Sequence, residues 1–212
     1  IRLSLVGSEM CIRDRYKDLT GEGEVTPGAS TLENHGDLKR IGNNSPRYRV
    51  GLNLDAAWKG IDFSIFFQGV LKRDWMFDAG DPYFWGAGSG MWQAACFEEH
   101  MDYWTPENTD AYYPKPYFNE TKNQQAQDAY MQKASYLRCK NIQLGYTLPT
   151  HITEKAGISN CRIYLSCDNL FTITGLSSVY DPEVFGSYDG YGTSGKTYPL
   201  QRTISVGVNL NF

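Results

Sequence analysis

The last eleven residues of the chain alternate strictly between apolar and polar positions. Every second position is apolar, in the order Ile204, Val206, Val208, Leu210 and Phe212. The positions between them carry small polar residues or glycine, in the order Thr203, Ser205, Gly207, Asn209 and Asn211. A period of two places the two sets on opposite faces of an extended strand. Residues 202–212 are therefore predicted to form a β-strand whose two faces meet different surroundings.

Four earlier segments repeat this alternation, at about residues 46–58, 61–72, 134–148 and 161–169. The first two are separated by a Lys-Gly step at 59–60, which predicts a tight hairpin. In the third segment Leu137 and Cys139 are out of phase with Ile142, so a β-bulge is predicted within 138–141. Tilted strands of about ten residues are long enough to cross the hydrocarbon layer of a membrane.

The predicted connections alternate in length. They hold about two, sixty, ten and thirty residues in chain order, and the second is the loop 73–133. Short turns at one end of the strands and long loops at the other are typical of outer-membrane barrels. A soluble, sugar-binding β-sandwich is the alternative, although nothing in such a fold requires this asymmetry. Five strands cannot close a barrel, and open sheet edges are not tolerated in lipid. We therefore expect an all-β chain that forms an incomplete barrel.

Composition narrows the function classes. The chain has 212 residues and a net charge of −4, so it offers no basic face for nucleic acid. It has no apolar run of about 18 residues that would predict a transmembrane helix. Its five cysteines form no CxxC pair, which argues against zinc and redox sites. Cys139 and Cys167 are predicted to be free thiols, because cross-strand pairs seldom meet disulfide geometry. Nothing matches a catalytic motif, so no enzymatic activity is predicted.

The first fifteen residues are predicted not to be native. Residues 5–15 resemble the translation of a sequencing-library adapter read in an open frame. On this interpretation residues 16–212 are native and form the C-terminal portion of a longer protein that begins further upstream.

Several motifs occur together and in a fixed order. They lie at residues 44–54, 58–70, 103–108, 136–149, 168–172 and 199–212. In combination they resemble the C-terminal end of the SusC/RagA family of TonB-linked (TonB-dependent) outer-membrane transporters. The resemblance covers about residues 16–212. Cys139 and Cys161 depart from the aliphatic or polar residues expected at their positions.

The resemblance implies a fold and a function. The fold would be a transmembrane outer-membrane β-barrel of about 22 strands with long extracellular loops, of which this chain supplies the C-terminal antiparallel strands. The function would be nutrient import, with a SusD-like surface lipoprotein as the lid and the TonB complex acting through an N-terminal region absent here. The cargo would be an oligosaccharide. Peptide import, or a binding or adhesion barrel without transport, are the alternatives.

The loop 73–133 is rich in aromatic residues, which suggests two interpretations. Aromatic rings stack on sugars and anchor protein interfaces, but a long ordered loop also needs a core of its own. The candidates for contact with substrate or lid are Trp85, Trp92, Tyr103 and Trp104. Glycines flank Trp85 and Trp92, which are therefore predicted to be the most exposed. Residues 98–100, Glu-Glu-His, are predicted to be a solvated turn rather than a zinc site.

Two further sets of residues are singled out. The polar positions of the strands are predicted to face the barrel lumen: Arg47, Arg49, Asn53, Asp55, Asp62, Gln68, Asn209 and Asn211. Residues 18–25 resemble the start of a calcium loop, with oxygen ligands from Asp18, Thr20 and Glu22. The twelfth position of that loop is Ala29, so the usual bidentate carboxylate is missing. A polar turn without metal is the alternative, and no other cofactor is predicted.

Overall fold

The computed structural model describes residues 17–29, 31–88, 95–117, 124, 126–184 and 197–212. The chain consists of two compact units. The described residues within 17–43 and 75–132 belong to the first, here called the loop unit. The described residues within 44–74, 133–184 and 198–212 belong to the second, called the sheet unit.

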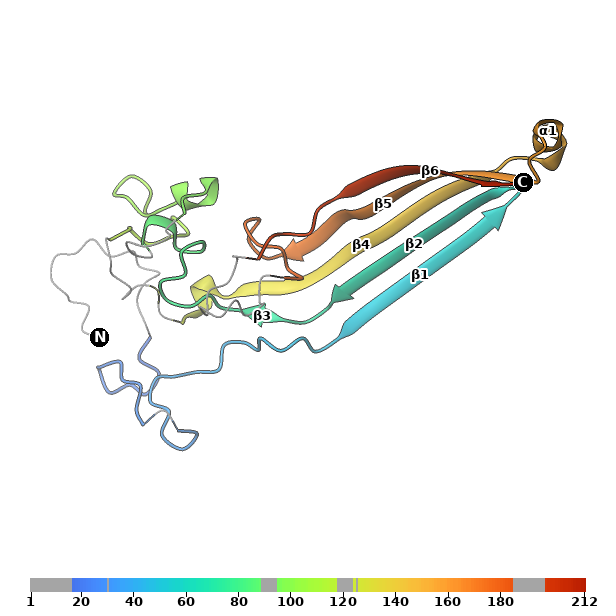
Figure 1. Ribbon diagram of the computed structural model, residues 1–212. Coiled ribbons are helices and arrows are strands. Elements are labelled where there is room, and N and C mark those ends of the chain that lie inside the picture. Colours follow the sequence, from blue (N-terminus) through green and yellow to red (C-terminus); the bar gives the residue numbers. More distant parts are fainter. Residues whose placement is uncertain (1–16, 30, 89–94, 118–123, 125, 185–196) are drawn as a thin grey trace. The chain divides into compact units, whose positions relative to one another are not determined.

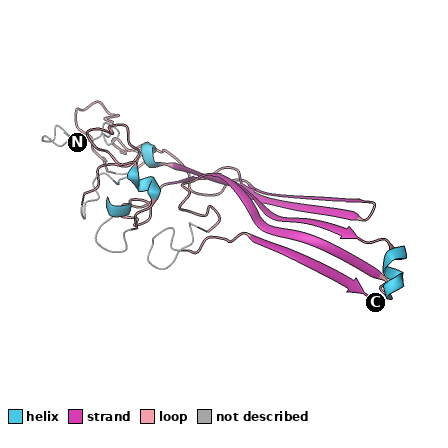
Figure 2. Cartoon of the chain, turned by 90° about the horizontal axis from the view of Figure 1, so that it is seen from above, coloured by secondary structure: helices cyan, strands magenta, loops and turns pink. Residues whose placement is uncertain are grey.

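The sheet unit is built on antiparallel strands (Figure 1). Their bounds are β1 Arg49–Trp58, β2 Ile61–Val70, β4 Gln132–Thr147, β5 Asn160–Gly175 and β6 Thr203–Asn211. The strand order is β1-β2-β4-β5-β6, and the short β3, Asp74–Trp75, pairs with β4 off this path. The strands run side by side along their length in the second view as well (Figure 2).

The short connections share one end of the sheet. The register pairs Trp58 with Ile61 and Asn160 with Asn211, so the 59–60 turn, the 148–159 connection and the end of β6 lie together (Figure 1). This is the short-connection end, and the opposite one is the long-connection end. Lys59 and Gly60 have φ of 48° and 87°, which is the geometry of a two-residue hairpin that follows the sheet twist.

One helical turn lies in the 148–159 connection. It consists of α1, Thr150–Thr153, and the 3₁₀ turn η6, Glu154–Ala156, and it ends at Gly157 with φ 71°. None of the helices in the described part of the chain has the length and apolar character needed to span a membrane.

The predicted β-bulge is present. Phe66 pairs with Asn141 and the next residue, Phe67, pairs with Cys139, so Lys140 is an extra residue in β4. The extra residue returns Cys139 to the face that carries Phe67. The apparent phase error in the sequence is therefore a real irregularity of the strand.

Strand β5 is longer than predicted. It continues to Gly175 instead of ending at residue 169, because Asn169 (φ 51°) lies in a second irregularity. Asp168 pairs with Asn141 and Phe171 pairs with Cys139, so three steps along β5 correspond to two steps along β4. The irregularity breaks the period of two, so alternation alone placed the end of the strand too early. The predicted start of β1 at residue 46 was also too early, although the backbone of Arg47 still bonds to the carbonyl of Lys72.

The register sorts the strand residues into two faces. The apolar face includes Leu52, Leu54, Trp58, Ile61, Phe63, Ile65, Ile142, Leu144, Tyr146, Ile163, Leu165, Ile204, Val206, Val208 and Leu210. Many of these side chains are exposed in this chain, and Val206 is 75% exposed. An apolar face of this extent is unlike the surface of a soluble monomer and marks a contact with another apolar phase.

The loop unit has little regular structure. It contains the 3₁₀ turns η2 Gly86–Gly88, η3 Glu98–Met101 and η5 Asp128–Tyr130. Its buried hydrophobic side chains are mostly aromatic: Phe77, Phe84, Trp85, Trp104, Tyr113 and Tyr130.

Candidate functional site

The polar face of the sheet collects most of the residues predicted to face a lumen. Residues of this face include Arg49, Asn53, Asp55, Asp62, Gln68, Arg162, Asn209 and Asn211. Arg47 precedes β1 and lies outside the strand. The structure therefore brings these positions together on one surface, opposite the apolar face.

An ion pair crosses three strands of the polar face. Arg162 on β5 donates from Nε to Asp62 Oδ1 on β2 at 2.9 Å, and its Nη2 contacts the other carboxylate oxygen. The same Nη2 donates to Gln143 Oε1 on β4 at 3.2 Å. Between the two partners lies Gly145, where a Cβ would stand 2.5 Å from Asp62 Oδ1 and 2.6 Å from Arg162 Nη2. The ion pair therefore occupies the space that a side chain at this position would need.

We expect Gly145→Val to displace the Asp62–Arg162 pair and to lower the stability of the assembled barrel relative to Gly51→Val. The measurement is the urea midpoint of the complete protein refolded into lipid vesicles. Gly51→Val is the matched control, because a Cβ at Gly51 meets the Phe66 ring and the Phe67 carbonyl oxygen at ordinary distances of 3.5 to 3.9 Å. Equal midpoints for the two variants would show that the ion pair tolerates a side chain at residue 145.

A second glycine on this face lies under an aromatic ring. The Tyr164 ring covers Gly207 of the neighbouring strand, where a Cβ would come within 2.3 Å of Tyr164 Cζ. The guanidinium carbon of Arg162 lies 5.0 Å from the centroid of the same ring. The ring thus covers exposed backbone and packs beside the ion pair.

The aromatic residues of the loop unit form a packed cluster centred on Phe84, which is 1% exposed. Its ring stacks on Phe77 at 4.5 Å and meets the edge of Trp85 at 4.7 Å. Tyr113 and Tyr130 complete the cluster at 5.7 and 6.4 Å. Such contacts add to the stabilisation from burial, so the cluster is the core of this unit.

The prediction that Trp85 is exposed was wrong. Trp85 is 5% exposed, its ring meets Tyr130 at 4.8 Å, and its indole N–H donates to the carbonyl of Asp78 at 2.9 Å. The flanking glycine at 86 has φ 56° and allows the chain to turn beneath the cluster, so it does not mark a surface tip.

The other candidates of this loop differ in placement. Trp104 is 6% exposed and packs on Ala111, whereas Tyr103 is half-buried. Trp92 lies outside the described residues. Whether any of the four contacts substrate or lid stays a prediction.

His100 has a structural role that the sequence did not reveal. It is 8% exposed, not part of a solvated turn. Its Nδ1 accepts the backbone N–H of Phe97 at 3.0 Å, and its Nε2 lies 3.2 Å from the carbonyl of Phe84. Because an amide N–H only donates and a carbonyl only accepts, these two contacts fit the tautomer with its hydrogen on Nε2. It caps η3 and ties that turn to the aromatic cluster.

The tyrosines beside His100 are held in the neutral form. Burial, followed by the charges of Glu99 and Asp102, raises the pKa of Tyr113 far above its ordinary value. Burial also raises the pKa of Tyr112. Both phenols therefore remain protonated at any physiological pH.

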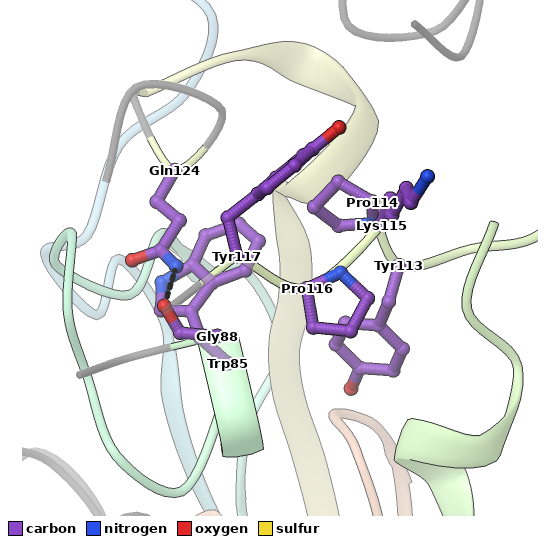
Figure 3. Close-up of a pocket in the computed structure, with 8 residues that line it drawn as sticks. All are labelled: Trp85, Gly88, Tyr113, Pro114, Lys115, Pro116, Tyr117 and Gln124. Atoms are coloured by element: carbon purple, nitrogen blue, oxygen red, sulfur yellow. Dashed lines mark hydrogen bonds between the residues drawn. The ribbon is translucent and has the colours of Figure 1, made fainter. Parts of the chain in front are cut away.

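A small cavity lies beside the cluster (Figure 3). Its volume is about 20 Å³, and it is lined by Trp85, Gly88, Tyr113, Pro114, Lys115, Pro116, Tyr117 and Gln124. Gln124 donates to the carbonyl of Gly88 and accepts the N–H of Gly80, each at 2.7 Å. A space of this size holds about one water, so it is no site for a sugar ring.

Two aspartates organise the segment 17–37. Asp18 accepts the N–H groups of Gly21 and Gly23 at 2.5 and 2.7 Å, and the hydroxyl of Thr20 at 3.2 Å. These bonds lower the pKa of Asp18. Among the residues that the structure describes, no group of three or more His, Cys, Asp or Glu side chains is placed to hold a metal. Calcium binding by Asp18, Thr20 and Glu22 stays a prediction.

Asp37 gives this segment an acid-sensitive anchor. Its carboxylate accepts the N–H groups of Leu19, Thr20 and Thr26 at 2.6 to 2.9 Å, and these bonds lower its pKa to about 2. A lowered pKa means that the stabilisation is complete above the ordinary value of 3.8 and is lost as the pH falls toward about 2.

We therefore expect the amides of residues 19, 20 and 26 to lose protection as the pH falls from about 4 to about 2. Asp37→Asn should remove this protection at neutral pH as well, since an amide side chain offers one oxygen instead of two. The measurement is amide hydrogen exchange followed by NMR. Glu24→Gln, at an exposed carboxylate of the same segment, should change nothing.

No family model matches the chain. Two curated proteins of Formosa agariphila do: TonB-dependent receptor P3, 29% identical over 204 residues, and TonB-dependent receptor P26, 26% identical over 206 residues. Each alignment covers 93% of this chain and 19% of the relative. The chain is related to the TonB-dependent receptors. It spans about a fifth of the length of these relatives.

Solved structures of a transporter also match the chain. The RagAB peptide transporter matches with a TM-score of 0.57 and 29% identity, covering 79% of this chain and 18% of that one. The RagAB peptide importer in the open-open state matches with a TM-score of 0.57 and 27% identity, covering 80% and 17%. The predicted resemblance to the SusC/RagA family and the predicted all-β, open antiparallel sheet are confirmed.

Proposed function

We propose that this chain supplies adjacent strands of the outer-membrane β-barrel of a TonB-dependent nutrient importer. The observation that carries the proposal is the separation of two faces by one continuous register. The apolar face would contact lipid, and the polar face would line the lumen, as strands of such barrels do. The short connections would lie on the periplasmic side and the long ones outside the cell.

The partners follow from the same proposal. A SusD-like surface lipoprotein would bind at the long-connection end, and the TonB complex would act through other parts of the protein. The relatives are called receptors and transporters, which favours a non-enzymatic role for this chain. We propose an oligosaccharide as the cargo, as the family resemblance implies.

Peptide import is the second candidate, because the similar solved structures are of a peptide transporter. The burial of Trp85 and Trp104 also weakens the argument that these two side chains stack on sugars.

The test is made on the protein in its producing cells. Recovery in a carbonate-washed outer-membrane fraction, extractable only by detergent, supports the barrel. Recovery in the aqueous fraction overturns it and favours the soluble sandwich.

Deletion of the gene then separates the cargo classes. Loss of growth on oligosaccharides with normal growth on peptides supports glycan import, and the reverse result supports peptide import. Normal growth on both would favour a binding barrel without transport. Co-purification of a surface lipoprotein from detergent extracts would test the proposed partner.

A further inference from the structure

A network of charged side chains lies at the long-connection end of the polar face. Arg138 on β4 pairs with Gln68 and Thr172 in the register, so its side chain leaves the sheet on the polar face. Its guanidinium donates to Thr172 Oγ1 at 2.8 Å, to Asp181 at 2.7 Å and to Glu183 at 2.8 Å. The side chains of Arg138 and Asp181 are only 4% and 5% exposed. The network is thus shielded from water on a face that is otherwise open.

The two carboxylates belong to the segment 176–184 that follows β5, here called the strap. Leu176 and Tyr180 of the strap are 7% and 5% exposed. Asp181 also accepts the N–H groups of Glu183 and Leu200, each at 2.9 Å, and so joins the strap to the residues that precede β6. The strap therefore covers the polar face around Arg138.

The network is electrically balanced. Lys140, the bulge residue, donates to both carboxylate oxygens of Glu183 at 3.2 Å. Two cations, Arg138 and Lys140, thus face two anions, Asp181 and Glu183. Burial pushes the pKa of Asp181 upward, but the N–H of Glu183 and the Arg138 guanidinium bring it below its ordinary value. The loss of the two carboxylate charges would leave two uncompensated cations.

We propose that the strap sets the charge selectivity of the polar face around Arg138. Through Asp181 and Glu183 it covers Arg138 and balances the charges of Arg138 and Lys140, so anionic cargo gains no attractive site at these two cations. The cargo class denied that site comprises oligomers bearing sulfate or carboxylate groups, while neutral oligomers are unaffected. The link to cargo rests on the proposed importer function, whereas the electrostatic balance is a property of the folded sheet unit.

The test measures the local potential with a cysteine probe in the complete, membrane-assembled protein. Gln68→Cys places a thiol beside Arg138, and Ser64→Cys, on the same strand and face, is the matched control. Cys96 and Cys161 are first replaced by serine, because they are not buried. The rates of reaction with an anionic and a cationic methanethiosulfonate reagent are then compared with and without Asp181→Asn and Glu183→Gln together.

We expect the anionic-to-cationic rate ratio at residue 68 to rise about tenfold when both carboxylates are neutralised, and the ratio at residue 64 to change by less than about twofold. If the double variant fails to assemble, Glu183→Gln alone should give about a threefold rise, since it frees one cation. An unchanged ratio at residue 68 overturns the proposal. Because the assay needs no transport, this failure is distinct from failure of the proposed import, which would appear only in the growth experiments.

Discussion

Replacement of Leu165 by arginine is expected to destabilise the assembled barrel by roughly 2–4 kcal/mol, the cost of a cation on the lipid face near the middle of the bilayer. Leu165 lies within the apolar face, between Leu144 and Val206 of the neighbouring strands, and is 48% exposed in this chain. No acidic side chain of the flanking register positions is available to compensate the charge.

The adjacent Ser166→Arg is the matched control, because Ser166 lies between Gln143 and Ser205 on the polar face. It should change stability by less than about 0.5 kcal/mol. The measurement is urea unfolding of the complete protein in lipid vesicles, with the heat-modifiable shift on gels as the sign of assembly. If both variants were equally stable, the assignment of the apolar face to lipid would be wrong.

The strands and one of their irregularities could be predicted from the sequence, because apolar and polar residues alternate with a period of two along a strand whose two faces differ. The bulge at Lys140 was predictable because it disturbs that period between two clear runs. The end of β5 was not, because Asn169 breaks the alternation and only a short run follows it. A strand irregularity can be recognised from the sequence when a regular alternating run lies on both sides of it. When the run on one side is short, the strand is predicted to end too early.

The candidate site was less predictable than the fold. The residues of the polar face could be predicted from the alternation alone, since every second residue of a strand lies on the same face. The Asp62–Arg162 pair could not, because its partners lie 100 residues apart and meet only across an intervening strand. The same limit applies to Arg138 and the strap. A glycine at 145 in an otherwise regular strand was the one available signal, since an interior glycine often marks a close approach.

The exposure of Trp85 in the loop unit was predicted wrongly for a different reason. Aromatic residues carry no periodicity outside regular structure, so composition could not separate a stacking surface from a core. His100 shows the same ambiguity, because two preceding glutamates suggested solvent while the imidazole itself is buried. Only the hydrogen bonds to Phe97 and Phe84 decide its role.

Truncation of Phe84 to alanine is the test of the aromatic cluster as a core. Phe84 is 1% exposed and contacts the rings of Phe77, Trp85, Tyr113 and Tyr130, so its loss should destabilise the loop unit by roughly 3–5 kcal/mol. That cost is enough to open the unit locally while the strands stay assembled.

The readout is limited proteolysis of residues 75–132 in the assembled protein, together with the fluorescence of Trp85 and Trp104. Tyr83→Ala is the control, because the neighbouring Tyr83 is half-buried and stacks on Phe97 alone among the described ring contacts. It should leave cleavage nearly unchanged. Rapid cleavage in both variants, or in neither, would show that the cluster is not what holds this unit together.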